Sequence, residues 1–292
     1  MVPHSLWKWM AGMRGALHDR RLRRVESIFL QAPRAPEWLE RADLECLSKH
    51  HIHTATYGYD PTSLEERGEE RARNILKEVP GPDLLRFLDL ACMDGMTAAA
   101  LQKRGKQCWG VDTDGQKFDP RARAAGVHLE EMDAMALDFP DGHFDVVYSF
   151  NAFEHFADPA TALHEALRVV RTGGYIYLHF GPLFGSAKGL HVYDRIPVPY
   201  CQYLFPIALM NEYLRDNRLP ELDPDHCNRW PVQRYRALWN SVAVEAEIID
   251  LTEFTYTDAL DIVERYPSCF RGKAEYFDEL LVNIMHVVLR KR

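Results

Sequence analysis

The sequence has no cysteine pair spaced as CxxC, no long apolar run and no glycine-rich phosphate loop. Its six cysteines are scattered through 292 residues, which argues against a disulfide framework and a zinc site and favours reduced thiols. No apolar run approaches the length that spans a bilayer, and residues 1–10 lack the apolar core of a signal peptide. These absences predict a cytoplasmic protein without stable membrane insertion.

Positive charge is also scarce, because 35 Lys and Arg against 43 Asp and Glu give a net charge of −8. A nucleic-acid binder needs clustered Lys and Arg to neutralise phosphates, so no nucleic-acid partner is expected. One local cluster near the N-terminus fits either a helix on a membrane surface or, as we expect, an amphipathic helix docked on the core. It comprises Trp7, Trp9, Arg20, Arg21, Arg23 and Arg24.

Beyond a turn-forming stretch at residues 79–83, short apolar runs alternate with helical patterns. Strands and helices are expected, in chain order, at 87–92, 96–104 (helix), 108–111, 128–131, 144–149, 159–170 (helix) and 175–180. This alternation indicates βαβ units and therefore an α/β fold with a doubly wound, mostly parallel sheet.

The alternation divides the chain into four parts. It fails after residue 181, in a stretch rich in proline and aromatic residues, and resumes with expected strands at 242–249 and 280–289 around a helix at 257–266. We expect a helical N-terminal lid at 1–80, a cofactor-binding core at 81–181, an inserted substrate cap at 182–240 and C-terminal strands completing the core at 241–292.

Acidic residues follow the expected strands, where a doubly wound sheet binds its ligand. Asp112 lies about 20 positions after the first turn, the place from which a carboxylate accepts hydrogen bonds from a ribose diol. Asp133 follows the third strand, where it is either a structural turn residue or an acceptor for an adenine amine. Asp145 begins its strand and is expected to be structural. The pattern favours a ligand that contains adenosine.

The first loop separates two kinds of adenosine ligand. A dinucleotide needs G-x-G-x-x-G for its pyrophosphate, but here Ala91 and Met93 occupy glycine positions and Gly95 remains. Met93 fits on the condition that its backbone does not require a positive φ. Asp89 and Asp94 make the loop acidic, which suits a positive sulfonium. S-adenosylmethionine is therefore expected, and NAD is disfavoured.

Residues 87–180 resemble the class I S-adenosylmethionine methyltransferases, in particular the methyltransferase type 11 group that includes ubiquinone-biosynthesis enzymes. The matching stretches are 87–95, 110–112, 132–134, 137–147, 153–156 and 166–174. The resemblance implies a seven-stranded Rossmann-like sheet, S-adenosylmethionine as cofactor and transfer of its sulfonium methyl group. It also implies a cofactor site made of Asp89, Ala91, Cys92, Gly95, Asp112, Thr113, Asp133, Ala134 and Asn151.

Bulky segments on both sides of the catalytic edge predict an enclosed pocket and hence a small-molecule acceptor. Oxygen is the first expectation for the acceptor atom, with nitrogen and carbon open. Two other functions stay open: a non-catalytic relative that binds the nucleoside, and an RNA or protein methyltransferase, for which a basic face would be the sign. A homodimer is compatible with the sequence.

Two histidines are candidates for a general base or for orienting the acceptor. His155 follows the fourth strand, and His191 lies in a Gly-x-His-x-Tyr stretch near the start of the cap. The alternative is that both hydrogen-bond the cap to the core, and Glu154 is equally open between a structural and a pocket role. The histidine-rich residues 49–53 fit a solvated or lid-lining segment better than a metal site. No metal is expected, and turnover should survive EDTA.

Overall fold

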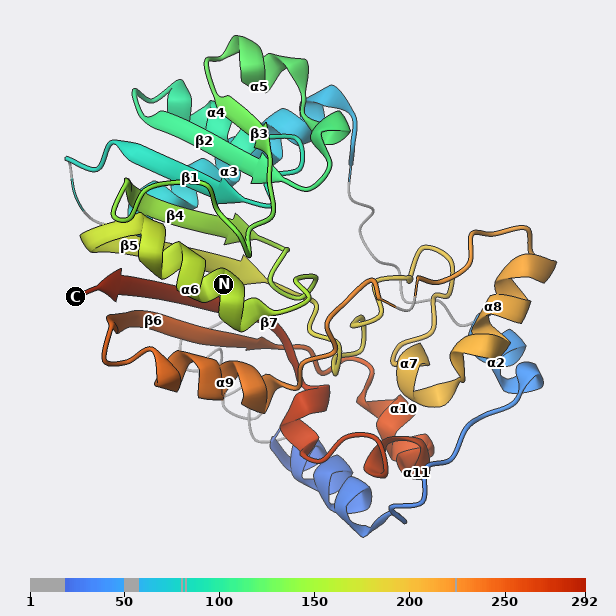
Figure 1. Ribbon diagram of the computed structural model, residues 1–292. Coiled ribbons are helices and arrows are strands. Elements are labelled where there is room, and N and C mark those ends of the chain that lie inside the picture. Colours follow the sequence, from blue (N-terminus) through green and yellow to red (C-terminus); the bar gives the residue numbers. More distant parts are fainter. Residues whose placement is uncertain (1–18, 50–57, 80, 82, 224) are drawn as a thin grey trace, which may run out of the picture.

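Seven strands form one sheet that carries helices on both faces, and a smaller helical region lies beside it (Figure 1). The structure, a computed structural model, describes residues 19–49, 58–79, 81, 83–223 and 225–292. The strands are β1 (Arg86–Leu90), β2 (Gln107–Asp112), β3 (His128–Glu131), β4 (Phe144–Phe150), β5 (Val170–Phe180), β6 (Ala246–Thr255) and β7 (Val282–Lys291). Their order across the sheet is β3-β2-β1-β4-β5-β7-β6.

The sheet is parallel from β3 to β5, and β7 runs antiparallel to both of its neighbours. The register pairs Leu90 with Val111 and Asp112 with Glu131, so β1, β2 and β3 end at one edge of the sheet. The predicted doubly wound, mostly parallel α/β sheet of seven strands is confirmed. The carboxyl edge is where such a sheet places its ligand.

Helices cover the two faces because each presents one apolar side to the sheet. Leu163, Leu167 and Trp239 pack one face from α6 and α9, whereas Ile75 and Ala99 pack the other from α3 and α4. The helices of the sheet core are α3 (Pro61–Glu78), α4 (Met96–Gln102), α5 (Pro120–Ala124), α6 (Pro159–Val169) and α9 (Val232–Ser241), with a 3-10 turn η1 (Gly115–Lys117).

Three core helices begin at an Asp-Pro pair. The side chains of Asp60, Asp119 and Asp158 accept backbone N–H groups of the first turns of α3, α5 and α6, respectively. Proline at the first helical position lacks only an N–H that would have no partner in the helix. This local signal explains why these helices start where they do.

A second apolar cluster, which we call the helical lobe, joins residues 19–47, 187–222 and 259–281. Its buried side chains include Val25, Phe29 and Phe270. The lobe contains a helix over residues 19–31, α2 (Arg41–Leu47), α7 (Cys201–Leu204), α8 (Ile207–Asp216), α10 (Leu260–Arg265), α11 (Pro267–Arg271) and a 3-10 turn η2 (Phe277–Leu280).

The arginines of residues 20–24 lie on a helix docked against this lobe, as the sequence predicts. Arg24 pairs with Glu264 at 2.7 Å and Arg21 with Asp261 at 3.9 Å, both on α10. Trp7 and Trp9 lie outside the described residues.

Three boundaries differ from the prediction. Residues 232–240 were assigned to the cap, but α9 packs into the sheet core. Helix α3 likewise belongs to the core, since its apolar side packs with α4. Strand β5 begins at Val170, so the glycine pair at 173–174, which was expected to end a helix, lies inside a strand. A register shift in the pairing with β4, near Val146, accommodates these residues.

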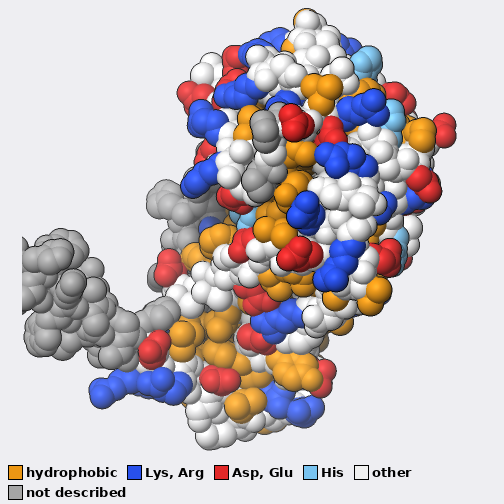
Figure 2. Space-filling view, turned by 90° about the vertical axis from the view of Figure 1, so that its left-hand side faces the viewer, with side chains coloured by type: hydrophobic (Ala, Val, Ile, Leu, Met, Phe, Trp, Pro, Cys, Tyr) orange, Lys and Arg blue, Asp and Glu red, His pale blue; other side chains and the backbone are white. Residues whose placement is uncertain are grey.

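Among the described residues, no helix is both long and apolar enough to cross a membrane. On the face drawn in Figure 2, Lys and Arg side chains are interspersed with Asp and Glu, so neither sign forms a continuous patch there. That distribution is unlike the clustered positive charge of a polyanion-binding face.

Candidate functional site

The loop after β1 passes over the end of β2, where Asp112 holds it. The Asp112 carboxylate accepts the N–H of Met93 at 2.9 Å through Oδ2 and the N–H of Asp114 at 3.1 Å through Oδ1. Asp112 is only 8% exposed. The backbone of Met132 donates to the Asp112 carbonyl at 2.9 Å. The three loops that follow β1, β2 and β3 therefore meet at Asp112, as predicted.

The condition that the sequence analysis set for Met93 is not met. Ala91 and Met93 both adopt positive φ, 55° and 52°, and Gly95 follows at 74°. The tight turn needs left-handed backbone at the positions where related loops would carry glycine. Here Ala91 and Met93 adopt that backbone conformation, which costs energy for residues that carry a side chain. Met93 is 37% exposed, so its side chain recovers little of that cost by packing.

Asp94 holds the start of α4 from within the first loop. Its Oδ1 accepts the N–H of Met96, the first residue of α4, at 2.8 Å. A pyrophosphate binds such helix N-terminal N–H groups, and here a carboxylate of the chain already accepts one of them.

Asp89 lies beneath the loop, 4% exposed on β1. Burial raises the pKa of its carboxyl group well above the ordinary range, and the positive charge of Arg71 opposes that shift. The neighbouring Cys92 is buried too, and burial, together with the charges of Asp89 and Asp112, raises the pKa of its thiol. Neither group is a surface turn residue.

Two arginines that the sequence analysis missed reach this loop from α3. Arg67 pairs with Asp94 at 3.2 Å and donates to the Gly58 carbonyl at 2.9 Å. Arg71 lies over the Phe150 ring, 4.7 Å from its centre, and near enough to Asp89 to affect its pKa. Their spacing of four residues places both on one side of the helix.

Gly68, between these two arginines, is the signal that could have found them. A Cβ there would lie 2.5 Å from the carbonyl oxygen of Met96, so only glycine lets α3 approach the start of α4 so closely. A glycine inside a helix costs about 1 kcal/mol relative to alanine. A glycine at this position therefore indicates that α3 packs closely against α4, which places the two flanking arginines beside the first loop.

The remaining predicted cofactor residues lie along the same edge. Ala134 is buried, whereas Thr113 and Asp133 are exposed, and Asp133 accepts the N–H of Met135 at 2.8 Å. Asn151 has a positive φ of 49° and donates its backbone N–H to the carbonyl of His179, which pins the turn after β4 to the end of β5. The structure thus brings all nine predicted residues to one edge of the sheet.

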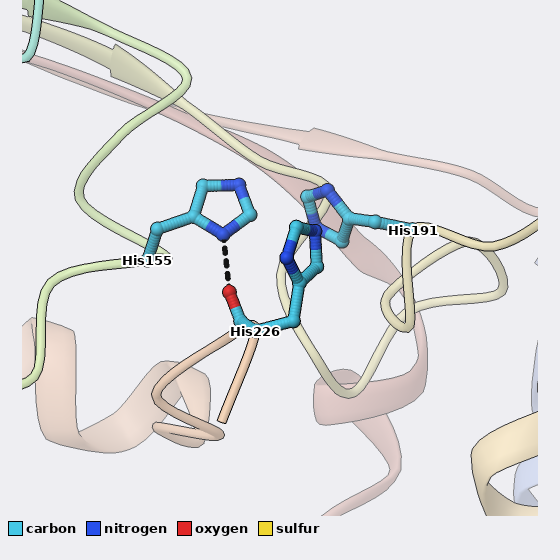
Figure 3. Close-up of side chains that lie close together, drawn as sticks. All are labelled: His155, His191 and His226. Carbon is cyan, nitrogen blue, oxygen red and sulfur yellow. Dashed lines mark hydrogen bonds between the residues drawn. The ribbon is translucent and has the colours of Figure 1, made fainter. Parts of the chain in front are cut away.

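The two predicted histidines also meet, and a third that the sequence analysis missed joins them. His155, His191 and His226 place one ring nitrogen each within 4.8 Å of one another (Figure 3). His155 follows β4, His191 follows β5, and His226 lies in the connection between α8 and α9. Separations of 36 and 35 residues hide this grouping in the sequence.

Burial and the neighbouring His155 lower the pKa of His191 to about 3, so His191 stays neutral at physiological pH and is a poor proton acceptor. Its Nε2 lies 2.8 Å from the carbonyl of Pro182. His155 is only partly buried, and its Nδ1 lies 2.5 Å from the carbonyl of His226. His155 is the more accessible of the two base candidates, and its role as a base stays a prediction.

Glu154 lies under this cluster. Burial raises the pKa of its carboxyl group, opposed by the charge of His155. Oε1 accepts the N–H of Gly181 at 3.1 Å, whereas Oε2 is buried with no hydrogen-bond partner among the described residues. Glu154 therefore links the turns after β4 and β5 and leaves one carboxylate oxygen open.

Residues 49–53, the other histidine-rich stretch, include His50, His51 and His53, which lie outside the described residues. Asp145 has the structural role expected of it. Its Oδ2 accepts the N–H groups of Leu85 and Arg86, both at 2.8 Å, and so joins the start of β1 to β4.

Residues 88–178, most of the sheet core from β1 into β5, match the family described as a methyltransferase domain. The chain is 38% identical over 128 residues to a demethylmenaquinone methyltransferase of Thermus thermophilus, covering 39% of this chain and 57% of that protein. It is 32% identical over 155 residues to a 2-methyl-6-phytyl-1,4-hydroquinone methyltransferase of Synechocystis, covering 48% and 47%.

A ubiquinone biosynthesis O-methyltransferase of Nitrosomonas europaea is 26% identical over 167 residues, covering 52% of this chain and 68% of that protein. The chain spans about half the length of the first two curated relatives. The family match lies within the sheet core, from β1 into β5, and includes none of the three segments of the helical lobe.

Proposed function

Because residues 88–178 form a class I S-adenosylmethionine-dependent methyltransferase domain, we propose that this chain transfers a methyl group to a small-molecule acceptor. The observation that carries the proposal is Asp112, a buried carboxylate at the meeting point of three loops on the carboxyl edge. A carboxylate in that position accepts hydrogen bonds from a ribose diol.

The donor set of the site fits S-adenosylmethionine and does not fit a dinucleotide. Asp94 occupies the N–H group at the start of α4 that a pyrophosphate would need. The carboxylates of Asp94 and Asp112 suit a ligand with a positive sulfonium and an amino group, and Asp89, whose pKa is raised by burial, lies beneath them. When bound, S-adenosylmethionine supplies an electrophilic methyl group.

Each part of the site has a distinct role in holding that cofactor. Asp112 would bind the ribose hydroxyls, and Asp133 with Ala134 would contact the adenine. Arg67 and Arg71 supply positive charge beside the first loop, where a carboxylate of the methionine part needs it. Residues 91–95 would follow the methionine chain, and Cys92 and Thr113 lie alongside, while Asn151 forms the floor after β4.

Methyl transfer requires a dry, aligned acceptor more than it requires covalent catalysis. His155 is the residue placed to orient an acceptor hydroxyl or to accept its proton at Nε2, because its Nδ1 is engaged by the carbonyl of His226. His191, held neutral and bonded to Pro182, positions that region. We propose oxygen as the acceptor atom.

The relatives support a quinone-type aromatic acceptor. Two are named for a demethylmenaquinone and a hydroquinone, without an acceptor atom, and the third for O-methylation in ubiquinone biosynthesis. The helical lobe, which lies next to the sheet core, is rich in buried aromatic residues such as Tyr200, Tyr203 and Phe205. These side chains pack in the lobe's own apolar cluster, so the lobe places an apolar body beside the sheet core.

Calorimetry with S-adenosylmethionine, S-adenosylhomocysteine and NAD tests the cofactor. We expect the first two to bind and NAD not to bind, and NAD binding alone would refute the assignment. A panel of phenols, hydroquinones, amines and carbon acids, incubated with methyl-labelled cofactor, then tests the acceptor. Label transfer to amines or carbon acids alone would refute oxygen as the acceptor atom.

A second candidate is a protein of this fold that binds the nucleoside without turnover. It is favoured by Ala91 and Met93, whose left-handed backbone makes the first loop costly to form. Tight binding of S-adenosylmethionine together with no label transfer across the whole panel would favour this candidate.

A further inference from the structure

We propose that His155, His191 and His226 bind one divalent transition-metal ion of the zinc type. Their ligand nitrogens all lie within 4.8 Å of one another (Figure 3). The proposal concerns binding by these side chains and does not depend on the methyltransferase function.

The second ring nitrogen of two of these histidines is already engaged in the way that metal ligands require. His155 Nδ1 is 2.5 Å from the carbonyl of His226, and His191 Nε2 is 2.8 Å from the carbonyl of Pro182. A carbonyl oxygen accepts but cannot donate, so each of these nitrogens carries the hydrogen. The opposite nitrogen of each neutral ring then keeps a lone pair for a metal, as in metal sites whose histidines donate to a carbonyl.

A buried carboxyl group beside the cluster favours a cation there. Glu154 Oε1 lies 3.8 Å from His155 Nε2, too far for a hydrogen bond. Glu154 Oε2 is buried without a hydrogen-bond partner among the described residues. A metal ion held by His155 would lie beside this carboxyl group and favour its ionised form.

The ligand type selects the kind of ion. Three neutral imidazoles suit zinc and its first-row neighbours, whereas calcium and magnesium prefer oxygen ligands. Zinc–nitrogen bonds of about 2.0–2.1 Å place tetrahedral ligands about 3.4 Å apart, so the rings must close by about 1.4 Å where they are widest. His226 is exposed and can make that movement.

The surrounding backbone holds the three segments in place for such closure. Asn228, two residues after His226, donates its side-chain N–H groups to the carbonyls of Phe153 at 2.7 Å and Phe156 at 3.1 Å. Its backbone N–H bonds the carbonyl of Glu154 at 2.9 Å. A bound ion would therefore fasten the connection between α8 and α9 to the turns after β4 and β5.

The proposed ion and a general base at His155 exclude one another. His155 Nδ1 is engaged by a carbonyl, so Nε2 is the one nitrogen available to a metal or to a substrate proton. Direct measurement of metal binding decides between them without any knowledge of the acceptor.

The test is a titration of chelator-treated, tag-free protein with Co²⁺, followed by displacement with Zn²⁺. We expect one Co²⁺ per chain, the visible absorption of a four-coordinate site, and a melting temperature that rises with Co²⁺. His226→Ala should lower Co²⁺ affinity about 100-fold or more and abolish that rise. This variant keeps the backbone carbonyl that orients His155, so its fold should be unchanged. His164→Ala, an exposed position on α6, is the matched control and should bind as the wild type does.

Two results would overturn the proposal. One is chelator-treated wild-type protein that takes up no stoichiometric Co²⁺. The other is Co²⁺ binding that persists in His226→Ala and His155→Gln but is lost when His50, His51 and His53 are all replaced by alanine. Turnover of S-adenosylmethionine is not read in this test, so its outcome is independent of the methyltransferase proposal.

Discussion

The sheet core and the helical lobe are built from the sequence in different ways. Five of the seven core strands follow one another between Arg86 and Phe180, with helices between most of them. The lobe draws its apolar residues from three segments that lie far apart in the chain. A region built from neighbouring segments can be predicted from a local sequence pattern, whereas a region built from distant segments cannot.

The largest expected effect is a loss of stability on removing one buried aromatic ring from either region. Trp239→Ala and Phe29→Ala each remove a fully buried aromatic ring, from the core and the lobe respectively, and each should cost about 3–5 kcal/mol. In Trp239→Ala the whole protein should unfold at lower denaturant. In Phe29→Ala the lobe should unfold first, while S-adenosylmethionine still binds the core.

Denaturation followed by far-UV signal and by cofactor binding in parallel measures this difference. Leu30→Ala is the control for Phe29→Ala, since Leu30 is 53% exposed on the same helix. Loss of both signals together in Phe29→Ala would mean that lobe and core unfold as one unit.

Cofactor binding should depend on the core alone. Asp112→Asn removes the charge at the end of β2 and should weaken binding of S-adenosylmethionine by about 1–3 kcal/mol, the scale for losing a charged hydrogen-bond acceptor. Titration calorimetry measures the change. Asp114→Asn, one turn position further on, is the matched control. Equal affinity of Asp112→Asn and wild type would place the ribose elsewhere.

Acid sensitivity should also differ between the regions, because Asp145 stabilises the core. Burial raises its pKa, but the N–H groups of Arg86 and Leu85 and the guanidinium of Arg171 together bring the pKa below its ordinary value of 3.8. A lowered pKa means that this stabilisation is present above pH 3.8 and is lost as the pH falls through the folded-state pKa.

Asp145→Ala should therefore destabilise the protein by about 1–3 kcal/mol at pH 7, and the difference from wild type should shrink below pH 4. Urea denaturation across that range measures it. Asp141→Ala, whose side chain is 81% exposed, should have little effect at any pH. A difference that stays constant down to pH 2 would contradict the assignment.

The smallest expected effect tests the cost of the first loop. Met93→Gly should stabilise the core by up to about 1 kcal/mol, because glycine adopts a φ of 52° without strain. Met93→Ala keeps the strained backbone and should gain nothing. Chemical denaturation compares the two variants, and equal stability of both would show that the strain is absent.

The features that the sequence predicted are those that depend on local segments, and the features it missed depend on distant ones. The strands, the helices between them and Asp112 came from local patterns of apolar runs and turn residues. Arg67 has one indirect local signal, the glycine at 68 inside a helix, and His226 has none. The partners of both residues lie in other segments, and only the folded chain brings them together. Helix α9 was predicted to belong to the cap for the same reason, because the sequence of an amphipathic helix does not show which surface its apolar side covers.

The position of β7 bears on how the protein is made. Strand β7 follows every other strand in the chain, yet it lies between β5 and β6. While the ribosome is still adding residues 282–291, the growing chain presents β5 as an open edge, with backbone groups ready to pair with another chain. The core therefore cannot mature one unit at a time from its N-terminal side, and its assembly waits until residues 282–291 have been synthesised.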